Sequence, residues 1–187
     1  MIYRVLLGLL IIVAIAFGYT KVMARIASGI PPVSVEAEHQ ADHIYVSKDD
    51  RMMYLMQDEI VLKSYSIAMG AQWDAGPKQR EGDERTPEGS YHIDWRNPRS
   101  VAHLSLHISY PDSDDRARGQ ENGYDPGSNI MIHGLPNGWG ALGSLHRLLN
   151  WTDGCIAVTN SEMQEIWSFT PNQTPITIVS NWSPNNN

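Results

Sequence analysis

The distribution of apolar and polar residues divides this 187-residue chain into a short leader and a longer part with strand-like patterning. Between Arg4 and Lys21, residues 5–19 carry no charged or strongly polar side chain. Because this run is apolar all round rather than along one stripe, it is unlike a helix on the surface of a soluble core. We predict a signal anchor or a signal peptide over residues 1–24, and of the two we favour an uncleaved anchor formed by residues 2–22.

The leader is followed by a stretch with the composition of a linker. Residues 25–41 contain Gly29 and the pair Pro31-Pro32 and then become polar, so we predict a linker that leaves the membrane. Residues 42–182 are predicted to form one folded domain, in keeping with about 150 residues per domain. Residues 183–187 are predicted to be a disordered tail.

Short apolar or alternating runs separated by turn residues predict strands throughout this domain. The first three runs follow one another closely enough to form a meander. In the run from Val101 to Ser109, even-numbered residues would share one face and odd-numbered residues the other. The predicted strands cover residues 43–47, 52–56, 60–69, 90–95, 101–109, 129–133 and 175–180.

Other segments of the domain have patterns typical of a loop or a helix. Residues 111–128 are polar and rich in Gly and Asp, which predicts a long functional loop. A short helix is predicted over residues 143–150, and another after Thr159 and Glu162, which form a capping box before an apolar face at helical spacing. The predicted fold class is therefore mostly β, a sheet sandwich or barrel with one or two short helices, preceded by an N-terminal apolar helix.

Composition and charge exclude several classes of protein. Hydrophobic residues make up 42% of the chain and charged residues 19%, which is enough apolar material for a folded core. The net charge is −7, and residues 1–30 hold three basic and no acidic residues, so the remainder carries −7 − 3 = −10. An acidic chain without a basic cluster is not expected to bind nucleic acid. Arg4 favours a cytoplasmic amino terminus and an exported domain, although Lys21 and Arg25 weaken this asymmetry.

The single cysteine, Cys155, excludes intramolecular disulfides and a Cys-rich zinc site. In an oxidising compartment a lone thiol needs either burial, as a small apolar residue, or a chemical use. Gly154 permits a tight turn before the thiol and exposes successive N–H groups, an arrangement suited to binding an oxyanion. Thr152 and Asp153 add polar groups beside it.

His133 ends a predicted strand and is followed at once by Gly134, so we expect it to face an opening rather than the core. A histidine there can take the thiol proton and hold a thiolate–imidazolium pair, and a backbone carbonyl can orient its ring. The alternative is an ordinary surface or core histidine. His103 and His107 are four residues apart, which suits zinc only on a helix; because the alternation predicts a strand, we expect no metal site.

A His-Gly pair, a later Thr-Asp-Gly-Cys sequence and a Thr-Pro segment occur together in this chain. Residues 132–134 and 152–156 resemble the His-Gly and Ser/Thr-x-Gly-Cys motifs of the L,D-transpeptidase catalytic domain, also called the YkuD domain. Residues 85–91 are similar to that family's Thr-Pro-x-Gly-x-Tyr segment, and residues 106–111 to the segment before its active-site loop. The resemblance extends over residues 42–180.

This resemblance implies a β-rich fold with the cysteine and histidine in a cleft, acting on peptidoglycan in the periplasm or cell envelope. Cys155 would be the nucleophile, His133 the base, and the Gly134 carbonyl the group that orients His133. The N–H groups of Gly154 and Cys155 would form the oxyanion hole. Cys155 would attack the diaminopimelate carbonyl of a tetrapeptide stem and expel D-Ala, after which an acceptor resolves the thioester. No metal or organic cofactor is implied.

Two positions depart from the family pattern. Many members have His where this chain has Asp153, and Arg where it has Ala157. Arg147, Arg96 and Arg99 are candidates to substitute for the missing positive charge, and Asp153 would raise the pKa of the thiol unless it is turned away. The residues expected to contact the substrate are Thr152, Asp153, Arg147 and Tyr110.

These departures leave the acceptor open among a stem amine, a lysine of a wall-linked protein, and water. The preferred interpretation is an L,D-transpeptidase. The alternatives are a cysteine hydrolase or amidase that cleaves peptidoglycan peptides or wall–protein links, and a non-catalytic cell-wall-binding module. The partners expected are peptidoglycan stem peptides and, through the N-terminal segment, the membrane. Because a −10 domain is weakly repelled by an anionic wall, recognition should come from local contacts in a cleft.

Overall fold

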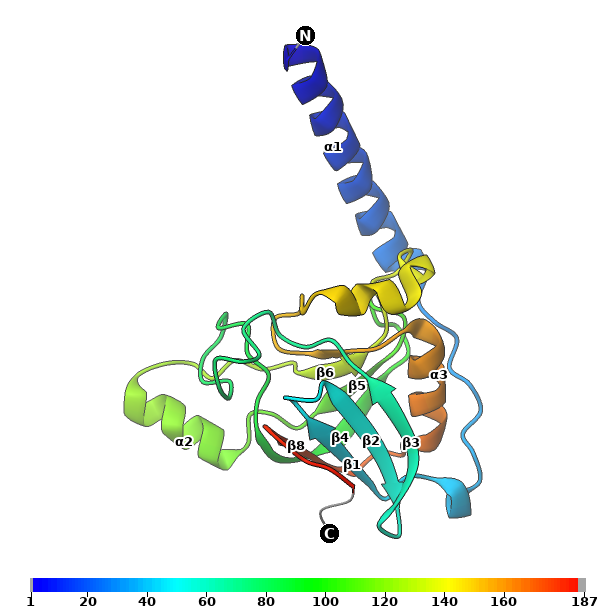
Figure 1. Ribbon diagram of the computed structural model, residues 1–187, viewed down its shortest axis with the longest axis vertical. Coiled ribbons are helices and arrows are strands. Elements are labelled where there is room, and N and C mark those ends of the chain that lie inside the picture. Colours follow the sequence, from blue (N-terminus) through cyan, green and yellow to red (C-terminus); the bar gives the residue numbers. More distant parts are fainter. Residues whose placement is uncertain (1, 185–187) are drawn as a thin grey trace.

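The computed structural model describes residues 2–184 of the chain, and in it eight strands form one curled sheet (Figure 1). The strand order is β3-β2-β1-β8-β4-β5-β6-β7. The strands are β1 (His43–Ser47), β2 (Met52–Gln57), β3 (Ile60–Ser66), β4 (Gly89–Asn97), β5 (Ser105–Ile108), β6 (Met131–His133), β7 (Ile156–Ala157) and β8 (Pro175–Val179). The helices are α1 (Ile2–Ile26), α2 (Ser113–Asn122) and α3 (Asn160–Phe169), and the 3₁₀ segments are η1 (Ala37–His39) and η2 (Gly140–Leu148).

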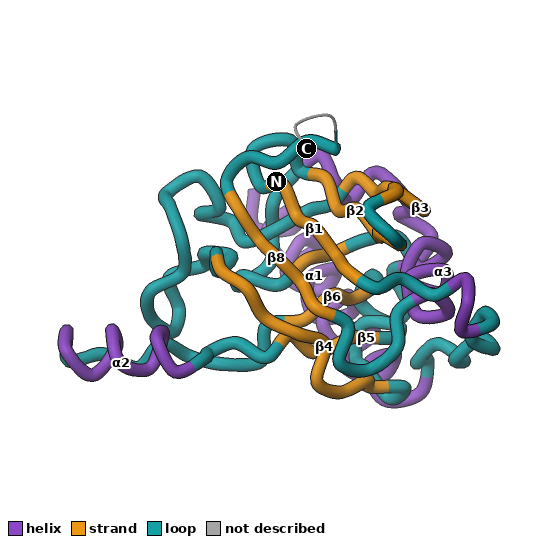
Figure 2. Tube along the Cα trace, turned by 90° about the horizontal axis from the view of Figure 1, so that it is seen from below, coloured by secondary structure: helices purple, strands orange, loops and turns teal. Residues whose placement is uncertain are grey.

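The curl of the sheet comes from β4, which belongs to both of its halves. Gly89 to His92 pair with β8, whereas Ile93 to Asn97 pair with β5, and the register shifts between Ile93 and Trp95. Such an irregularity bends a strand and increases its twist. The predicted β-rich class is confirmed, in the form of one continuous curled sheet in which β8 lies between β1 and β4 (Figure 2).

The predicted meander is confirmed as β1, β2 and β3, which pair antiparallel in that order. Alternate residues of the neighbouring strands β1 and β8 point into the core, where Ile44, Val46, Ile176 and Ile178 are fully buried. The helix after Thr159 is also confirmed: Thr159 and Glu162 form the capping box, and Met163, Ile166 and Trp167 of α3 are buried.

The prediction of a loop over residues 111–128 is wrong in part, because this stretch contains α2. Asp112 caps the helix reciprocally with Asp115, and Gly123 ends it in the left-handed conformation. The helix has almost no apolar face, so the periodicity that reveals an amphipathic helix is missing. It is attached to the domain by a polar contact instead, since Tyr91 Oη donates to the buried carboxylate of Asp115 at 3.1 Å.

The predicted strand over residues 101–109 is too long. Only β5 forms, because His103 has a positive φ of 63° and its N–H donates to the side chain of Asn137 at 2.7 Å. The alternation also does not translate into one buried and one open face, since all four residues of β5 are buried between β4 and β6. The third strand likewise ends at Ser66, before the predicted Met69.

The segment predicted as a helix over residues 143–150 is η2, which begins earlier and has a non-helical kink at Gly143. A two-residue strand, β7, follows it and was not predicted. The helix α1 runs to Ile26, two residues past the expected boundary of the leader, and none of its residues is buried. By length and composition it is apolar enough to cross a membrane, with a mean hydropathy of 2.3 in its most apolar 18-residue window.

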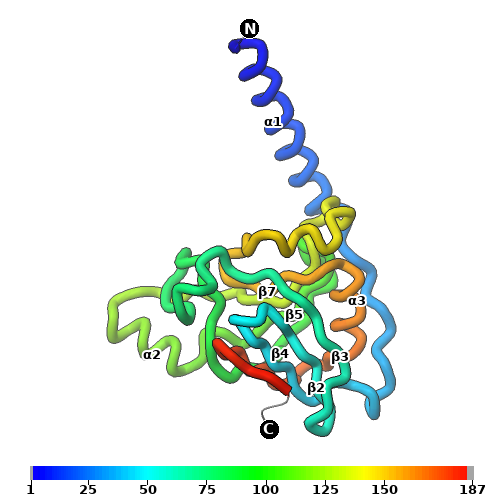
Figure 3. Tube along the Cα trace, viewed as in Figure 1, coloured from blue at the N-terminus to red at the C-terminus, as the bar shows by residue number. Residues whose placement is uncertain are grey.

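The predicted linker is fastened to the domain along α3 (Figure 3). Val35 N–H donates to Ser168 O at 3.1 Å, and Ala41 N–H donates to Phe169 O at 2.8 Å. The side chain of Gln164 donates to Ile30 O at 3.0 Å. Of the predicted tail, residues 185–187 lie outside the described residues.

Candidate active site

The parallel pairing of β6 and β7 brings His133 and Cys155 together. Ile132 is opposite Ile156, and His133 is opposite Ala157. Because side chains alternate along a strand, Cys155, which immediately precedes β7, is on the same face as His133 and diagonal to it. The sequence prediction that these two residues share a site is therefore consistent with the strand register.

The ring of His133 is oriented by its neighbour. Its Nδ1 lies 2.6 Å from the carbonyl oxygen of Gly134, the contact expected from the sequence. A carbonyl oxygen only accepts, so Nδ1 carries the hydrogen and Nε2 has the free lone pair. Burial lowers the pKa of His133, and the weaker opposing effect of the Gly134 carbonyl does not cancel it. The edge of Trp151 packs against the ring, with centroids 5.8 Å apart.

The thiol of Cys155 is also held in its neutral form. Burial raises its pKa, the Met131 N–H and Lys78 oppose this, and the charge of Asp153 adds to it in the direction expected from the sequence. The Sγ atom lies 3.6 Å from the carbonyl oxygen of Asn129, to which it donates. The sequence led us to expect a thiolate–imidazolium pair. Burial favours a neutral thiol and a neutral imidazole instead, and so disfavours such a pair at rest.

Thr152 and Gly154 build the turn that presents the thiol. Thr152 Oγ1 donates to Cys155 O at 2.7 Å and accepts from Gly154 N–H at 3.2 Å. Gly154 has a φ of +123°, and a Cβ there would lie 2.4 Å from Arg85 O, so only glycine fits. Thr152 is buried in the turn and is not placed to bind substrate as expected. Of the two N–H groups expected to form an oxyanion hole, that of Gly154 donates to Thr152 Oγ1.

The Thr-Pro segment lies directly behind this turn and supports it. Gly70 N–H donates to Thr86 Oγ1 at 3.2 Å, and a Cβ on Gly70 would lie 2.2 Å from Glu84 O. The backbone at Glu84 and Arg85 therefore packs without a gap against Gly70 and Gly154. This explains the family-like motif over residues 85–91 as structural support for the cysteine turn.

Lys48 fixes that segment from the other side. Its side chain is 2% exposed, and Nζ donates to Glu88 Oε1 at 2.7 Å and to Thr86 O and Gly76 O at 3.3 Å each. The sequence analysis did not single out Lys48, because a lysine next to Asp49 and Asp50 has the pattern of an exposed turn. A buried, fully hydrogen-bonded lysine has no distinguishing sequence signal.

A cavity of about 380 Å³ opens at the thiol. Its lining combines both signs of charge with small residues from the loop before β6. The lining residues are Lys78, Glu81, Gly82, Gly127, Ser128, Asn129, Ile130, Asp153 and Cys155. Lys78 is itself buried and donates to Asp83 at 2.8 Å. It is the basic residue of this lining, and the sequence analysis missed it.

The other expected substrate contacts are placed differently. Asp153 is exposed and lines the cavity. Tyr110 is buried and donates through Oη to Pro126 O at 2.9 Å, so it holds the loop that lines the cavity. Arg147 forms an ion pair with Glu162, and Arg96 stacks on Trp167 at 4.1 Å. Both arginine side chains therefore contact residues of α3.

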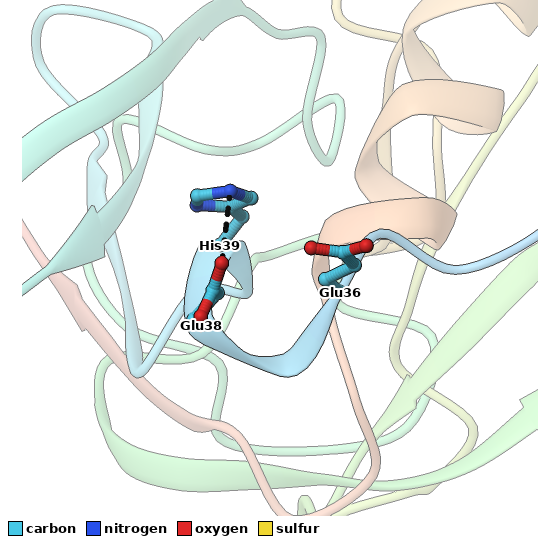
Figure 4. Close-up of side chains that lie close together, drawn as sticks. All are labelled: Glu36, Glu38 and His39. Carbon is cyan, nitrogen blue, oxygen red and sulfur yellow. Dashed lines mark ion pairs between the residues drawn. The ribbon is translucent and has the colours of Figure 1, made fainter.

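Two groups of metal-ligand residue types lie outside this site. His107 Nδ1 is 2.6 Å from Asp94, and His103 Nε2 is 2.8 Å from Gln164, so the two histidines have separate partners. Glu36, Glu38 and His39 have ligand atoms within 4.8 Å of one another (Figure 4). All three are exposed, and their contact is a 3.6 Å ion pair between His39 and Glu38, which does not define a metal centre.

The fold and the site define a β-rich domain with a cysteine and a histidine on adjacent strands, and residues 41–178 match the model of the L,D-transpeptidase catalytic domain, YkuD. The Escherichia coli (strain K12) protein named "Putative L,D-transpeptidase YafK" is 32% identical over 153 residues, which cover 76% of this chain and 54% of that protein. The chain thus spans about half the length of this curated relative. The chain belongs to the L,D-transpeptidase catalytic domain family, which acts on peptidoglycan stem peptides.

Solved structures share the fold. The helical cell shape determining protein Pgp2 from Campylobacter jejuni matches with a TM-score of 0.57 and 21% identity, covering 88% of this chain and 56% of that one. Bd1075 from Bdellovibrio bacteriovorus matches with a TM-score of 0.52 and 23% identity, covering 83% of this chain and 54% of that one.

Proposed function

We propose that the protein is a peptidoglycan L,D-transpeptidase in which Cys155 forms a thioester with the diaminopimelate carbonyl of a tetrapeptide stem. D-Ala is released, and the acyl group passes to an amine acceptor. The observation that carries this proposal is the placement of Cys155 and His133 on one face of adjacent strands, with Cys155 at a cavity and Nε2 of His133 free to accept a proton.

In the first step, Sγ of Cys155 attacks the carbonyl carbon while Nε2 of His133 takes the thiol proton. Because both groups are neutral at rest, the proton moves during the attack, which is general-base catalysis. The S–C bond forms, and the N–H of Cys155 donates to the developing oxyanion. Collapse breaks the C–N bond, and the imidazolium returns its proton to the departing amine of D-Ala.

In the second step, an acceptor amine attacks the thioester carbonyl and His133 takes its proton. The C–S bond breaks, and the sulfur regains the proton from His133. A new amide is formed, as either a 3–3 crosslink between stems or a link to a protein lysine. With water as the acceptor, the same steps would release a tripeptide.

The charges of the cavity support a diaminopimelate donor. The free end of that side chain carries an ammonium and a carboxylate. Asp153 and Glu81 provide negative partners for the ammonium. The basic residue of the lining, Lys78, is already paired with Asp83, so we assign no partner to the carboxylate.

We also propose that α1 anchors the protein in the inner membrane, with the catalytic domain in the periplasm or cell envelope. The exposed apolar surface of α1 and its length support this proposal. The basic residue Arg4 on the short amino-terminal side favours a cytoplasmic start.

The test is to incubate the full chain with purified tetrapeptide muropeptides and to analyse the products by liquid chromatography and mass spectrometry. We expect release of D-Ala and a 3–3 linked dimer, and neither with the Cys155→Ala variant. Tripeptide without dimer would contradict transfer to an amine and identify a hydrolase. If neither D-Ala nor a thioester is formed by the folded wild-type chain, the catalytic proposal is wrong and the chain is a binding module.

A further inference from the structure

Exposed apolar side chains of the catalytic domain are concentrated on η2 and the residue after it. Beyond residue 33, seven large hydrophobic side chains are exposed in the described chain, and four of them belong to this one segment. They are Leu142, Leu145, Leu148 and Leu149, with exposed fractions of 43, 63, 78 and 72%. A cluster of this kind on an acidic domain indicates an interaction surface rather than scattered exposure.

These four leucines line an open apolar cavity of about 440 Å³ together with Thr20 of α1. None of the residues that line the cavity at Cys155 lines this one. The leucine surface therefore adjoins the N-terminal helix and lies apart from the thiol. Trp151 also lines this cavity and packs against the ring of His133, so the surface borders the histidine side of the proposed site.

The end of α1 is fixed to the start of η2. Tyr19 Oη donates to Gly138 O at 3.0 Å, and Trp139 Nε1 donates to Thr20 Oγ1 at 3.1 Å. The rings of Tyr19 and Trp139 meet edge to face with centroids 5.9 Å apart. In Figure 1, α1 projects from the domain at η2, and η2 runs across the foot of α1.

The length of α1 determines where this junction would lie relative to the bilayer. From Ile2 to Thr20 the helix rises about 27 Å at 1.5 Å per residue, close to the ~30 Å of a bilayer's hydrocarbon core. The Tyr19–Trp139 pair and Lys21 thus fall where the helix would leave the hydrocarbon, the level at which amphipathic aromatic residues gather. The leucines of η2 lie beside this level.

We infer that η2 and Leu149 form a membrane-docking surface, and that its occupant is the lipid bilayer crossed by α1. The inference rests on the proposed membrane anchor. The four leucines enter the interface of the bilayer, as the apolar face of an interfacial helix does, and hold the domain against the membrane in one orientation. Because the two cavities share no lining residue, lipid covers η2 while the thiol stays open to stem peptides.

The test places an environment-sensitive fluorophore on the full chain in vesicles of phosphatidylethanolamine and phosphatidylglycerol. In a Cys155→Ala background, a nitrobenzoxadiazole label is attached after Leu145→Cys or, as the matched control, after Ile60→Cys. Ile60 is 67% exposed and begins β3 at the hairpin far from α1 (Figure 1). We expect the label at position 145 to be quenched by nitroxide-bearing lipids and to be about tenfold less sensitive to aqueous iodide than the label at position 60.

Three results would overturn the inference. Equal iodide quenching at both positions, in a chain that resists extraction by alkaline carbonate, would leave the anchor intact and exclude docking. Extraction by carbonate would remove the anchor and docking together. Protection at position 145 that disappears on dilution into more lipid would assign the surface to a second copy of the chain. Since the muropeptide assay measures chemistry at Cys155, failure of the proposed reaction is distinguishable from each of these.

Discussion

The Nδ1 atom of His133 lies 2.6 Å from the carbonyl oxygen of Gly134, the residue that follows it. This contact places the imidazole hydrogen on Nδ1 and leaves Nε2 as the proton acceptor. Together with the burial that lowers the pKa of the ring, it suits His133 to the proposed role of general base, because burial favours the neutral imidazole.

The first prediction concerns the acid limb of activity. Acylation of Cys155 by a carbapenem, followed by mass spectrometry, should lose rate as pH falls, with a midpoint below the ordinary histidine value of about 6.5. The reason is that only neutral His133 accepts the proton, and its pKa is lowered. His133→Gln should reduce the rate about 10²- to 10⁴-fold. The exposed His92→Gln should leave rate and profile unchanged; an acid limb above pH 6.5 would contradict the assignment.

The second prediction concerns the thiol itself. Alkylation of Cys155 by iodoacetamide reports the thiolate, so its rate should rise with pH through a midpoint above that of the same residue in the urea-unfolded chain. The physical cause is burial, which raises the pKa of Cys155. A midpoint near neutrality would indicate a resting thiolate–imidazolium pair and a different first step.

A third prediction separates backbone strain from steric contact. Gly154→Ala should destabilise the fold by at least about 3 kcal/mol, because it adds a clash with Arg85 O to the strain of a positive φ. The control is Gly123→Ala, which has a φ of +71° and open space around its Cβ, and should cost about 1 kcal/mol. Urea unfolding measures both; equal losses would show that the contact with Arg85 carries no weight.

The fourth prediction concerns the buried lysine behind the cysteine turn. Lys48→Met should cost about 3–5 kcal/mol, since it removes the buried cation from its ion pair with Glu88 and its hydrogen bonds to two carbonyl groups. Lys63→Met removes an ion pair with Glu165 in which both side chains are more than a third exposed, and should cost at most about 1 kcal/mol. Lys48→Met should also slow acylation of Cys155, and a variant as stable and reactive as the parent would refute this support.

The fifth prediction tests whether Arg147 serves the substrate. Burial raises the pKa of Glu162, but hydrogen bonds from Arg147 and Thr159 outweigh it and the pKa is lowered. A lowered pKa stabilises the fold above the unfolded value of about 4.3, and this contribution is lost as pH falls through the lowered value. Arg147→Gln should therefore lose about 1 kcal/mol at pH 7 and progressively less below pH ~4. The Michaelis constant of this variant for the stem peptide should be unchanged. A clear increase would indicate that Arg147 binds the substrate.

Local sequence signals predicted the elements whose stability is local. The meander of β1 to β3 follows from short apolar runs between turns, and the start of α3 follows from Thr159 and Glu162. The polar helix α2 was missed because its capping box lies on Asp112 and Asp115 without an apolar face behind it. The strand predicted from Val101 was too long because His103 gives up extended geometry to bond with Asn137, a residue far along the chain.

The sequence by itself determined that the chain has an apolar N-terminal segment, a β-rich domain and one cysteine preceded by a glycine, since these depend on residue type and spacing alone. Only the tertiary structure decided how the charges are used. Arg147 forms an ion pair with Glu162, Lys78 lines the cavity, and the buried Lys48 donates to Thr86 O. It also decided that the pKa of Cys155 is raised and that of His133 lowered, because the burial that shifts a pKa is created by packing between segments that are distant in the sequence.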